Sequence, residues 1–176
     1  MNGHNYSPPL FREEQRFRQP LLWAMILFTS GISIFSTISQ EVFSRPIGNN
    51  LQPDWVLIIL MIVFGVALPI LLWTAVLVTE VRADGVYYRF FPFHRSFHQI
   101  PFSSIHNYRA CTYHPIADYG GWGIRYGWRG KGKAYNVSGN RGVKFEFTEG
   151  KPLLIGSQRP EEFARAIEQA SGIAPS

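Results

Sequence analysis

The sequence contains a single cysteine, Cys111, which excludes an internal disulfide framework and fits a reducing compartment. It also lacks Asp, Glu, Lys and Arg in two long stretches, between Arg18 and Glu41 and between Asp54 and Glu80. Each stretch exceeds the roughly 20 residues that a helix needs to cross about 30 Å of hydrocarbon. The sequence therefore predicts an integral membrane protein with two transmembrane helices.

We expect the two spans at residues 20–39 and 55–78, joined by a short connection. Ser, Gly and Thr are frequent in the second half of the first span. They predict a small, polar face packed on the second span, or else they only lower the hydrophobicity of the first. Pro69 predicts a kink in the second span. Neither span contains an ionisable group, which argues against an ion or proton pathway.

A cleaved signal peptide is the alternative for the first span, but the apolar run is long and lacks a convincing cleavage site. The distribution of arginine predicts the topology. Three arginines precede the first span and three closely follow the second, whereas the connection has only Arg45. We therefore expect a protein of the cell (cytoplasmic) membrane with both termini in the cytoplasm. The tail segment 11–18 is expected to lie at the membrane interface as a short helix.

From Thr79 the sequence alternates with a period of two, which is typical of strands. Asp84-Gly85 and Glu149-Gly150 predict hairpin turns. The period then changes to 3.6, which predicts a helix that begins at Pro160 and ends before Gly172. Short strands are expected at residues 79–83, 86–91, 97–100, 105–111, 122–128, 134–137, 142–147 and 153–155.

These elements give an α+β fold with three parts: a cytoplasmic tail at 1–19, a transmembrane hairpin at 20–78 and a cytoplasmic domain at 79–176. The domain resembles the bacterial PH-like (pleckstrin-homology-like) domain. Residues 99–105 match the family's Ile-Pro-Trp/Tyr-x-x-Ile segment, with Phe102 at the aromatic position. The opening hairpin and the later strands are matched by residues 81–86, 123–125, 139–143 and 154–161.

The resemblance covers about residues 15–170, and membrane proteins of this group often carry two transmembrane helices before the domain. It implies a small, bent or barrel-like antiparallel sheet closed by a C-terminal helix. PH-like domains elsewhere bind lipids and proteins, but a fold does not by itself transfer a function.

The most distinctive segment of the domain is rich in cations and has no acidic residue between Asp118 and Glu146. Aromatic residues, among them Tyr126 and Tyr135, are interleaved with the cations. Near an anionic leaflet each cation gains about 1 kcal/mol, so we expect a surface for lipid headgroups or an acidic partner. The alternative is a solvated sheet face. The candidate binding residues are Arg125, Arg129, Lys131, Lys133, Arg141 and Lys144.

No pattern in the sequence indicates catalysis. The glycines near residues 120–132 lack a Walker pattern, and turns explain them better than a phosphate loop. His94 and His98 have no carboxylate or cysteine partner at a metal-binding spacing, so we expect no metal and no cofactor. Cys111 fits a strand residue and not an activated nucleophile. Nucleic acid is not expected as a partner, since no RNA-binding motif is present.

The sequence thus predicts a non-catalytic binding or scaffolding module that is anchored in the membrane. Its partners would be anionic membrane lipids, another membrane protein or further copies of the chain. The alternative is an accessory subunit of a larger integral membrane complex, with the small-residue face of the first span packed on partner helices.

Overall fold

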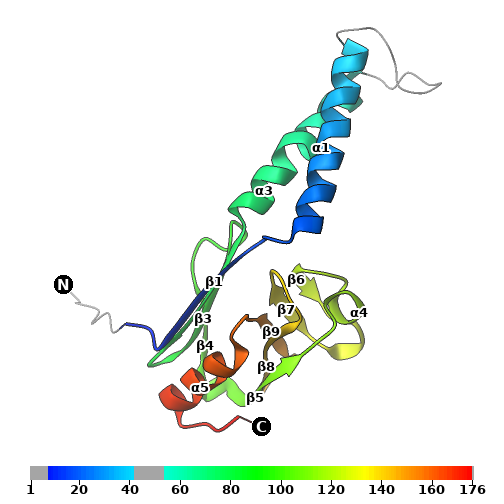
Figure 1. Ribbon diagram of the computed structural model, residues 1–176. Coiled ribbons are helices and arrows are strands. Elements are labelled where there is room, and N and C mark those ends of the chain that lie inside the picture. The colour runs from blue at the N-terminus through cyan, green and yellow to red at the C-terminus, as the bar shows by residue number, and fades with distance from the viewer. Residues whose placement is uncertain (1–7, 42–53, 176) are drawn as a thin grey trace. The chain divides into compact units, whose positions relative to one another are not determined.

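The computed structural model describes residues 8–41 and 54–175. The chain forms two compact units, shown as ribbons in Figure 1. The helical unit is Phe17–Ala75. The sheet unit combines the residues up to Arg16 with those from Val76 onward. The sheet unit is therefore discontinuous in the chain, and the helical unit is inserted into it.

Two helices make up the helical unit. The first is α1 (Pro20–Glu41), and the second consists of α2 (Asp54–Leu60), the π-helical segment η1 (Met61–Ala67) and α3 (Leu68–Thr74). The wider turns of η1 come just before Pro69, which has no N–H to donate to a helical hydrogen bond. At the end of η1, Leu68 N–H donates to the carbonyl of Val63, five residues earlier, as in a π-helix. Both helices are long and apolar enough to cross a membrane.

The polar face of α1 packs on the second helix, as the sequence predicts. Ser30 Oγ donates to the carbonyl of Phe64 at 2.8 Å, and Thr37 Oγ1 donates to that of Leu57 at 3.3 Å. A Cβ atom at Gly65 would lie 3.2 Å from Cγ1 of Ile34, so a glycine permits close approach here. Small side chains and hydroxyl bonds thus join the two helices.

The first sheet of the sheet unit has four antiparallel strands in the order β1-β2-β3-β4. They are β1 (Phe11–Arg16), β2 (Val76–Arg82), β3 (Gly85–Phe91) and β4 (His98–Pro101). The prediction of a helix at 11–18 is wrong, because this segment pairs with β2 from Phe11↔Val81 to Arg16↔Val76. The pairing joins strands that precede and follow the helical unit in the chain.

The second sheet has five strands in the order β5-β8-β9-β7-β6. Among these described strands β7 and β9 pair in parallel, and the other pairs are antiparallel. The strands are β5 (Ile105–Thr112), β6 (Gly123–Tyr126), β7 (Lys133–Asn136), β8 (Arg141–Phe147) and β9 (Leu153–Gly156). Short helical turns are η2 (Phe102–Ser104), α4 (Pro115–Tyr119) and η3 (Trp128–Gly130). Across the described residues the strands form two sheets and not one closed barrel.

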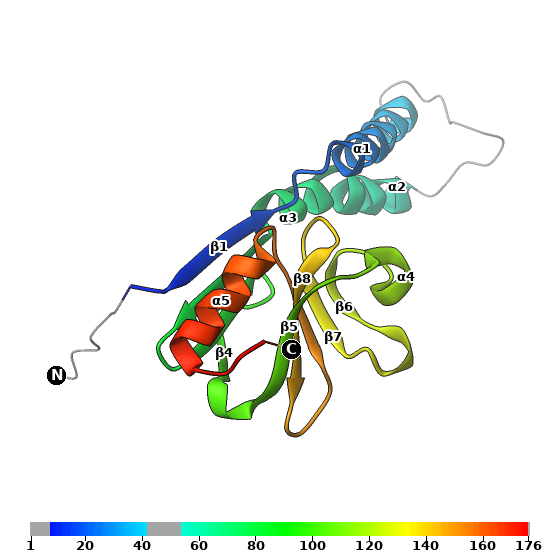
Figure 2. The same ribbon diagram turned by 60° about the horizontal axis from the view of Figure 1, so that its bottom comes forward.

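The C-terminal helix α5 (Pro160–Ser171) contacts strands of both sheets, as Figure 2 shows. Phe163 and Ile167 on its apolar face are completely buried. The ring of Phe163 stacks on Phe11 of β1 at 5.1 Å and lies 6.0 Å from that of Phe145 of β8. The helix therefore provides the core between the sheets, which confirms the predicted amphipathic helix.

The second predicted span extends too far toward the C-terminus. Helix α3 ends at Thr74, and β2 begins at Val76. Val76, Leu77 and Val78 are apolar because they lie in the core of the sheet unit, where each is at most 8% exposed. Hydrophobicity alone does not distinguish a buried strand from the end of a membrane helix.

The inward face of β1 is held by polar bonds to the segment between β9 and α5. Oε2 of the buried Glu13 accepts a bond from Ser157 Oγ at 2.5 Å, and its Oε1 accepts one from Gln158 N–H at 2.7 Å. Gln15 Nε2 donates to the carbonyl of Gly156 at 2.7 Å. These bonds fix an edge strand whose inward positions are largely polar.

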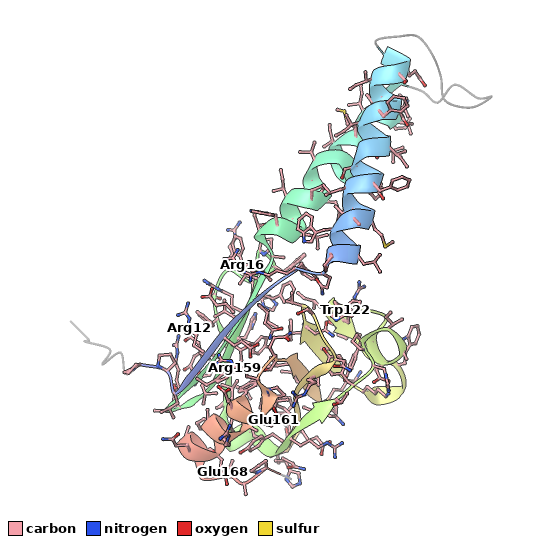
Figure 3. All side chains as sticks on the ribbon, in the orientation of Figure 1. Arg12, Arg16, Trp122, Arg159, Glu161 and Glu168 are labelled. Atoms are coloured by element: carbon pink, nitrogen blue, oxygen red, sulfur yellow. The ribbon has the colours of Figure 1, made fainter. Side chains whose placement is uncertain are left out.

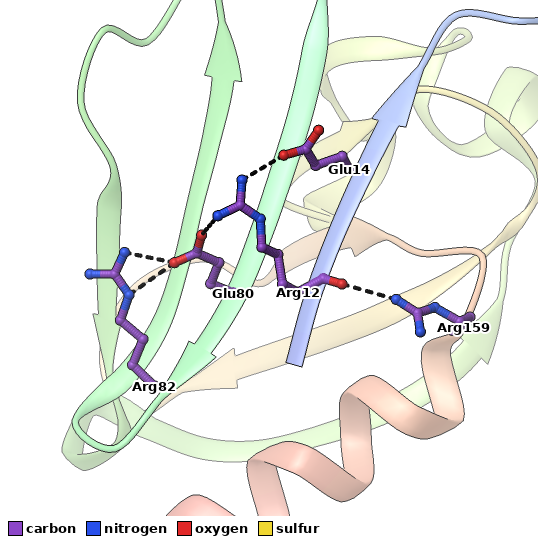
Figure 4. Close-up of polar contacts among 5 residues, drawn as sticks. All are labelled: Arg12, Glu14, Glu80, Arg82 and Arg159. Carbon is purple, nitrogen blue, oxygen red and sulfur yellow. Dashed lines mark hydrogen bonds and ion pairs between the residues drawn. The ribbon is translucent and has the colours of Figure 1, made fainter. Parts of the chain in front are cut away.

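The outward face of the same strand carries an ion-pair network, shown in Figure 4. The carboxylate of Glu80 is 1% exposed and accepts bonds from Arg12 at 3.0 Å and from Arg82 at 2.6 Å. Arg12 also pairs with Glu14, and its carbonyl accepts a bond from Arg159. A buried carboxylate with two guanidinium partners is stable only while both remain in place, so the network ties β1 to β2.

We predict that Glu13→Ala destabilises the sheet unit by about 1–3 kcal/mol, because Ser157 and Gln158 lose a charged, buried acceptor. The matched control is Glu14→Ala on the exposed face of β1, with an expected cost below about 1 kcal/mol. The free energy of unfolding is measured on the full chain in mild detergent. Equal losses of stability in both variants would contradict this role of the Glu13 hydrogen bonds.

Candidate functional site

The six predicted binding residues do not form one free basic surface. Three of them are paired with carboxylates. Lys131 Nζ lies 2.5 Å from Oδ1 of Asp118, and Lys144 Nζ lies 3.2 Å from Oε1 of Glu146. Arg141 pairs with Glu161 of α5, whose label in Figure 3 marks the position. The side chain of Arg129 lies outside the described part of the structure.

The remaining two, Arg125 and Lys133, lie on opposite faces of the second sheet. Arg125 is the register partner of Ala134, whereas Lys133 is the partner of Tyr126 on the next row. Successive residues of a strand point to opposite faces, so these rows face different sides. Arg125 Nε donates to the carbonyl of Trp122, labelled in Figure 3, at 2.9 Å. Lys133 faces the first sheet.

A pocket of about 460 Å³ lies between the two sheets on the face of Lys133. The first sheet contributes Tyr88 of β3 together with residues of β4 and the η2 turn. The second sheet contributes Tyr126, Lys133, Phe147, Leu153 and the glycine-rich turn near η3. Lys151, which precedes β9, adds a second cation. Among the described residues that line the pocket there is no carboxylate.

Two aromatic rings position the ammonium group of Lys133. Its Nζ lies 4.7 Å from the ring centroid of Tyr135 and 5.5 Å from that of Tyr126. A cation over aromatic faces is attracted electrostatically by the rings. The arrangement therefore offers a fixed positive charge that is available to an anion in the pocket.

Tyr88 lies at the centre of an aromatic cluster on this face. Its ring is 4.8 Å from Tyr135, 5.4 Å from His98 and 6.2 Å from His94. Burial, followed by the neighbouring Tyr135, raises the pKa of Tyr88, so its hydroxyl is protonated at neutral pH. Burial, followed by His98 and Lys133, lowers the pKa of His94, which is therefore neutral there.

The pocket contains residues that the sequence did not single out as binding residues. Tyr88, Gln99 and Lys151 all line it, and among the residues whose side chains are described, Lys133 is the one lining residue that belongs to the predicted set. Lys151 follows the acid-containing turn Glu149-Gly150 and carries no local signal of a site. Pairing of β7 with β9 brings Lys133 opposite Leu153 and close to Lys151, and this parallel pairing is not visible in the sequence.

The polar groups that line the pocket are hydrogen-bond donors suited to an anion. In the described ranges, no cluster of three or more His, Cys, Asp or Glu side chains is arranged as a metal site requires. Burial raises the pKa of the Cys111 thiol, so the protonated form predominates at neutral pH. The pocket itself provides ammonium groups, tyrosine hydroxyls and an amide, which are donors for an oxyanion.

Comparison with known proteins gives one match. The model of a family described as a family of unknown function (DUF6141) matches residues 5–174 of this chain. No curated protein and no solved structure matches it.

The low pKa of His94 predicts a pH-dependent stability. The unfolded chain takes up a proton near pH 6.5, the ordinary value for histidine, whereas the folded chain resists protonation. Protonation would also remove the acceptor for Phe90 N–H at Nδ1. The free energy of unfolding should therefore be largest above the unfolded pKa and decrease as the pH falls through it toward the folded value.

His94→Gln should flatten this dependence between pH 7.5 and 5.5, whereas His106→Gln, at an exposed position, should leave the slope unchanged. The midpoint of thermal unfolding of the full chain in detergent measures both. Parallel curves for the wild type and His94→Gln would show that His94 is not the responsible group.

Proposed function

The chain belongs to this family of unknown function, and we propose that it is a non-catalytic binding module held in the membrane by its helical unit. In this proposal the sheet unit binds an anionic group in the pocket that contains Lys133. The group belongs to a lipid headgroup or to a partner protein.

Three observations support the membrane anchor. Pro20–Gln40 and Trp55–Thr74 each have the length of a transmembrane helix. Most of their large apolar side chains are exposed, which a bilayer would cover. The pairing Arg16↔Val76 keeps the two connections of the helical unit side by side, so the start of α1 and the end of α3 would lie on the same side of a bilayer. The arginines at 12–18 and 82–95 support the proposal that this is the cytoplasmic side of the cell membrane.

The strands and the C-terminal helix of the sheet unit support a PH-like domain. Mostly antiparallel strands followed by a C-terminal helix agree with the bacterial PH-like resemblance. Two features differ from the expected domain: the strands form two sheets, and the first strand is contributed by residues before the helical unit. We propose a PH-like module whose first strand is separated from the others by the membrane hairpin.

The observation that carries the binding function is the charge of the pocket. Lys133 and Lys151 line a space of about 460 Å³ without a carboxylate among its described lining residues. The paired cations outside it, such as Arg141, have much of their charge compensated. Tethering to the bilayer keeps the pocket at a high effective concentration near lipid headgroups, so modest affinity is sufficient.

We predict that Lys133→Met weakens anion binding about tenfold or more, since a charged hydrogen bond contributes about 1.5–3 kcal/mol. Methionine keeps most of the apolar stem of lysine and removes the ammonium group with its charge and its N–H donors. Binding of glycerol 3-phosphate to the full chain is measured by calorimetry, in nanodiscs of phosphatidylcholine so that the bilayer supplies no anionic competitor.

Lys144→Met is the matched control, because Lys144 lies on the opposite face of the sheet and pairs with Glu146. It should leave the affinity within about twofold, as expected for an exposed ion pair. Equal weakening by both substitutions would indicate general charge attraction, and no effect of Lys133→Met would exclude the pocket as the site.

An accessory subunit of a larger membrane complex is the second candidate, and one observation favours it. A Cβ atom at Gly31 would meet no atom within 4 Å, so this part of α1 is open. The neighbouring Phe28 and Phe35 are 70% and 63% exposed. Another transmembrane helix would approach closely at this glycine.

Gly31→Leu tests this candidate, because the chain itself offers no clash. We expect the substitution to remove a co-purifying membrane protein while the stability of the purified chain changes by less than about 1 kcal/mol. Ser30→Leu is the comparison, since Ser30 faces the second helix and its substitution should lower stability. A partner retained at full stoichiometry by Gly31→Leu would rule this face out.

A further inference from the structure

We propose that the loop between β3 and β4 inserts into the lipid interface and forms a third point of membrane contact. The β3–β4 loop is residues 92–97, with sequence Pro-Phe-His-Arg-Ser-Phe. The proposal rests on the membrane anchor proposed above and adds the surface by which the sheet unit itself touches lipid.

The register of the first sheet places this loop next to the chain segments that enter and leave the helical unit. Arg16 of β1 pairs with Val76 of β2, and Val76 pairs with Phe91, the last residue of β3. The end of β1, the start of β2 and the end of β3 thus lie at the same end of the sheet. The end of β1 connects to α1 through the few residues before Pro20, and the start of β2 connects to α3 through Ala75.

Chain geometry limits the distance between Phe91 and Thr74, the last residue of α3. Consecutive Cα atoms are about 3.8 Å apart and paired strands about 5 Å apart, so Phe91 lies within about 13 Å of Thr74. Trp55–Thr74 is 20 residues long, and about 1.5 Å per residue gives the thickness of the hydrocarbon layer. Thr74 therefore lies at its boundary, and Phe91 lies within reach of the headgroup layer.

The direction of the strands places the loop at the end of the sheet where the chain connects to the helical unit. Strand β2 runs away from Ala75, and β3 runs back toward that end before the chain turns. His94 N–H donates to the carbonyl of Phe90 at 2.8 Å, which makes the turn tight and places Phe93 at its tip. The phenyl groups of Phe91 and Phe93 are 43% and 58% exposed.

Phe91 at the end of β3 and Phe93 on the loop expose apolar area, and burial of this area at the interface would stabilise it. Arg95, also exposed, follows them and suits an anionic headgroup. An apolar tip flanked by a cation is the pattern of an interfacial anchor. The lipid interface is therefore the partner that fits this surface.

The test uses single-cysteine variants of the full chain in nanodiscs that contain anionic lipid, with Cys111 replaced by serine and a nitroxide attached. Phe93→Cys is the main variant, and Phe91→Cys is the second in case the first does not fold. Accessibility to oxygen and to a water-soluble nickel complex reports the depth of each label. We expect the labels at positions 93 and 91 to be more accessible to oxygen than to the nickel complex.

Two controls separate this inference from the membrane anchor. Phe28→Cys on the exposed face of α1 should report the hydrocarbon layer. Leu10→Cys should report water, because Leu10 is half-exposed and precedes β1 at the opposite end of the same sheet, about 20 Å away.

Each outcome has one meaning. Water at Phe28 would overturn the membrane anchor, and with it the proposed function. Lipid at Phe28 with water at Phe93 and Phe91 would overturn only the loop contact. Lipid at both Phe93 and Leu10 would also overturn it, because the sheet would then lie along the membrane and not contact it at one end.

Discussion

The pairing of β1 with β2 is the constraint on which the rest of the structure depends. Its register, from Phe11↔Val81 to Arg16↔Val76, joins the two parts of the chain that flank the helical unit. Three contacts require β1 to be in place: the ion pair of Arg12 with Glu80, the hydrogen bond of Ser157 to Glu13, and the stacking of Phe11 on Phe163. The sheet unit is therefore a domain completed by its own N-terminal strand, and the helical unit is an insertion between two neighbouring strands.

This constraint also explains which parts of the fold the sequence revealed. The helices at 20–41 and 54–74 and the later strands have strong local patterns, and they were predicted nearly at the correct positions. Strand β1 has no such pattern, because its inward residues include Glu13 and Gln15, and their partners lie at residues 156–158. A polar strand satisfied by distant groups resembles an amphipathic tail when only neighbouring residues are considered.

The candidate site shows the same division between local and distant information. The cluster of basic residues is a true feature of the sequence, but Asp118, Glu146 and Glu161 pair with three of its members in the fold. Alternation along β6 and β7 then separates Arg125 from Lys133. Lys133 joins Lys151 and Tyr88 in a pocket that depends on the parallel pairing of β7 with β9. Charge is readable from composition, whereas its compensation and direction depend on the fold.

The discontinuity of the sheet unit also determines the order of events during synthesis. Strand β1 leaves the ribosome before both helices, and its pairing partner β2 follows after them. Residues 157–158, which donate hydrogen bonds to Glu13 of β1, are synthesised later still. Such long-range pairing is normally slow, because a long loop must close before any contact forms. In the proposed membrane arrangement, insertion of the helical hairpin closes this loop and brings Arg16 to Val76. The bilayer would then act as the template on which the sheet unit begins to fold.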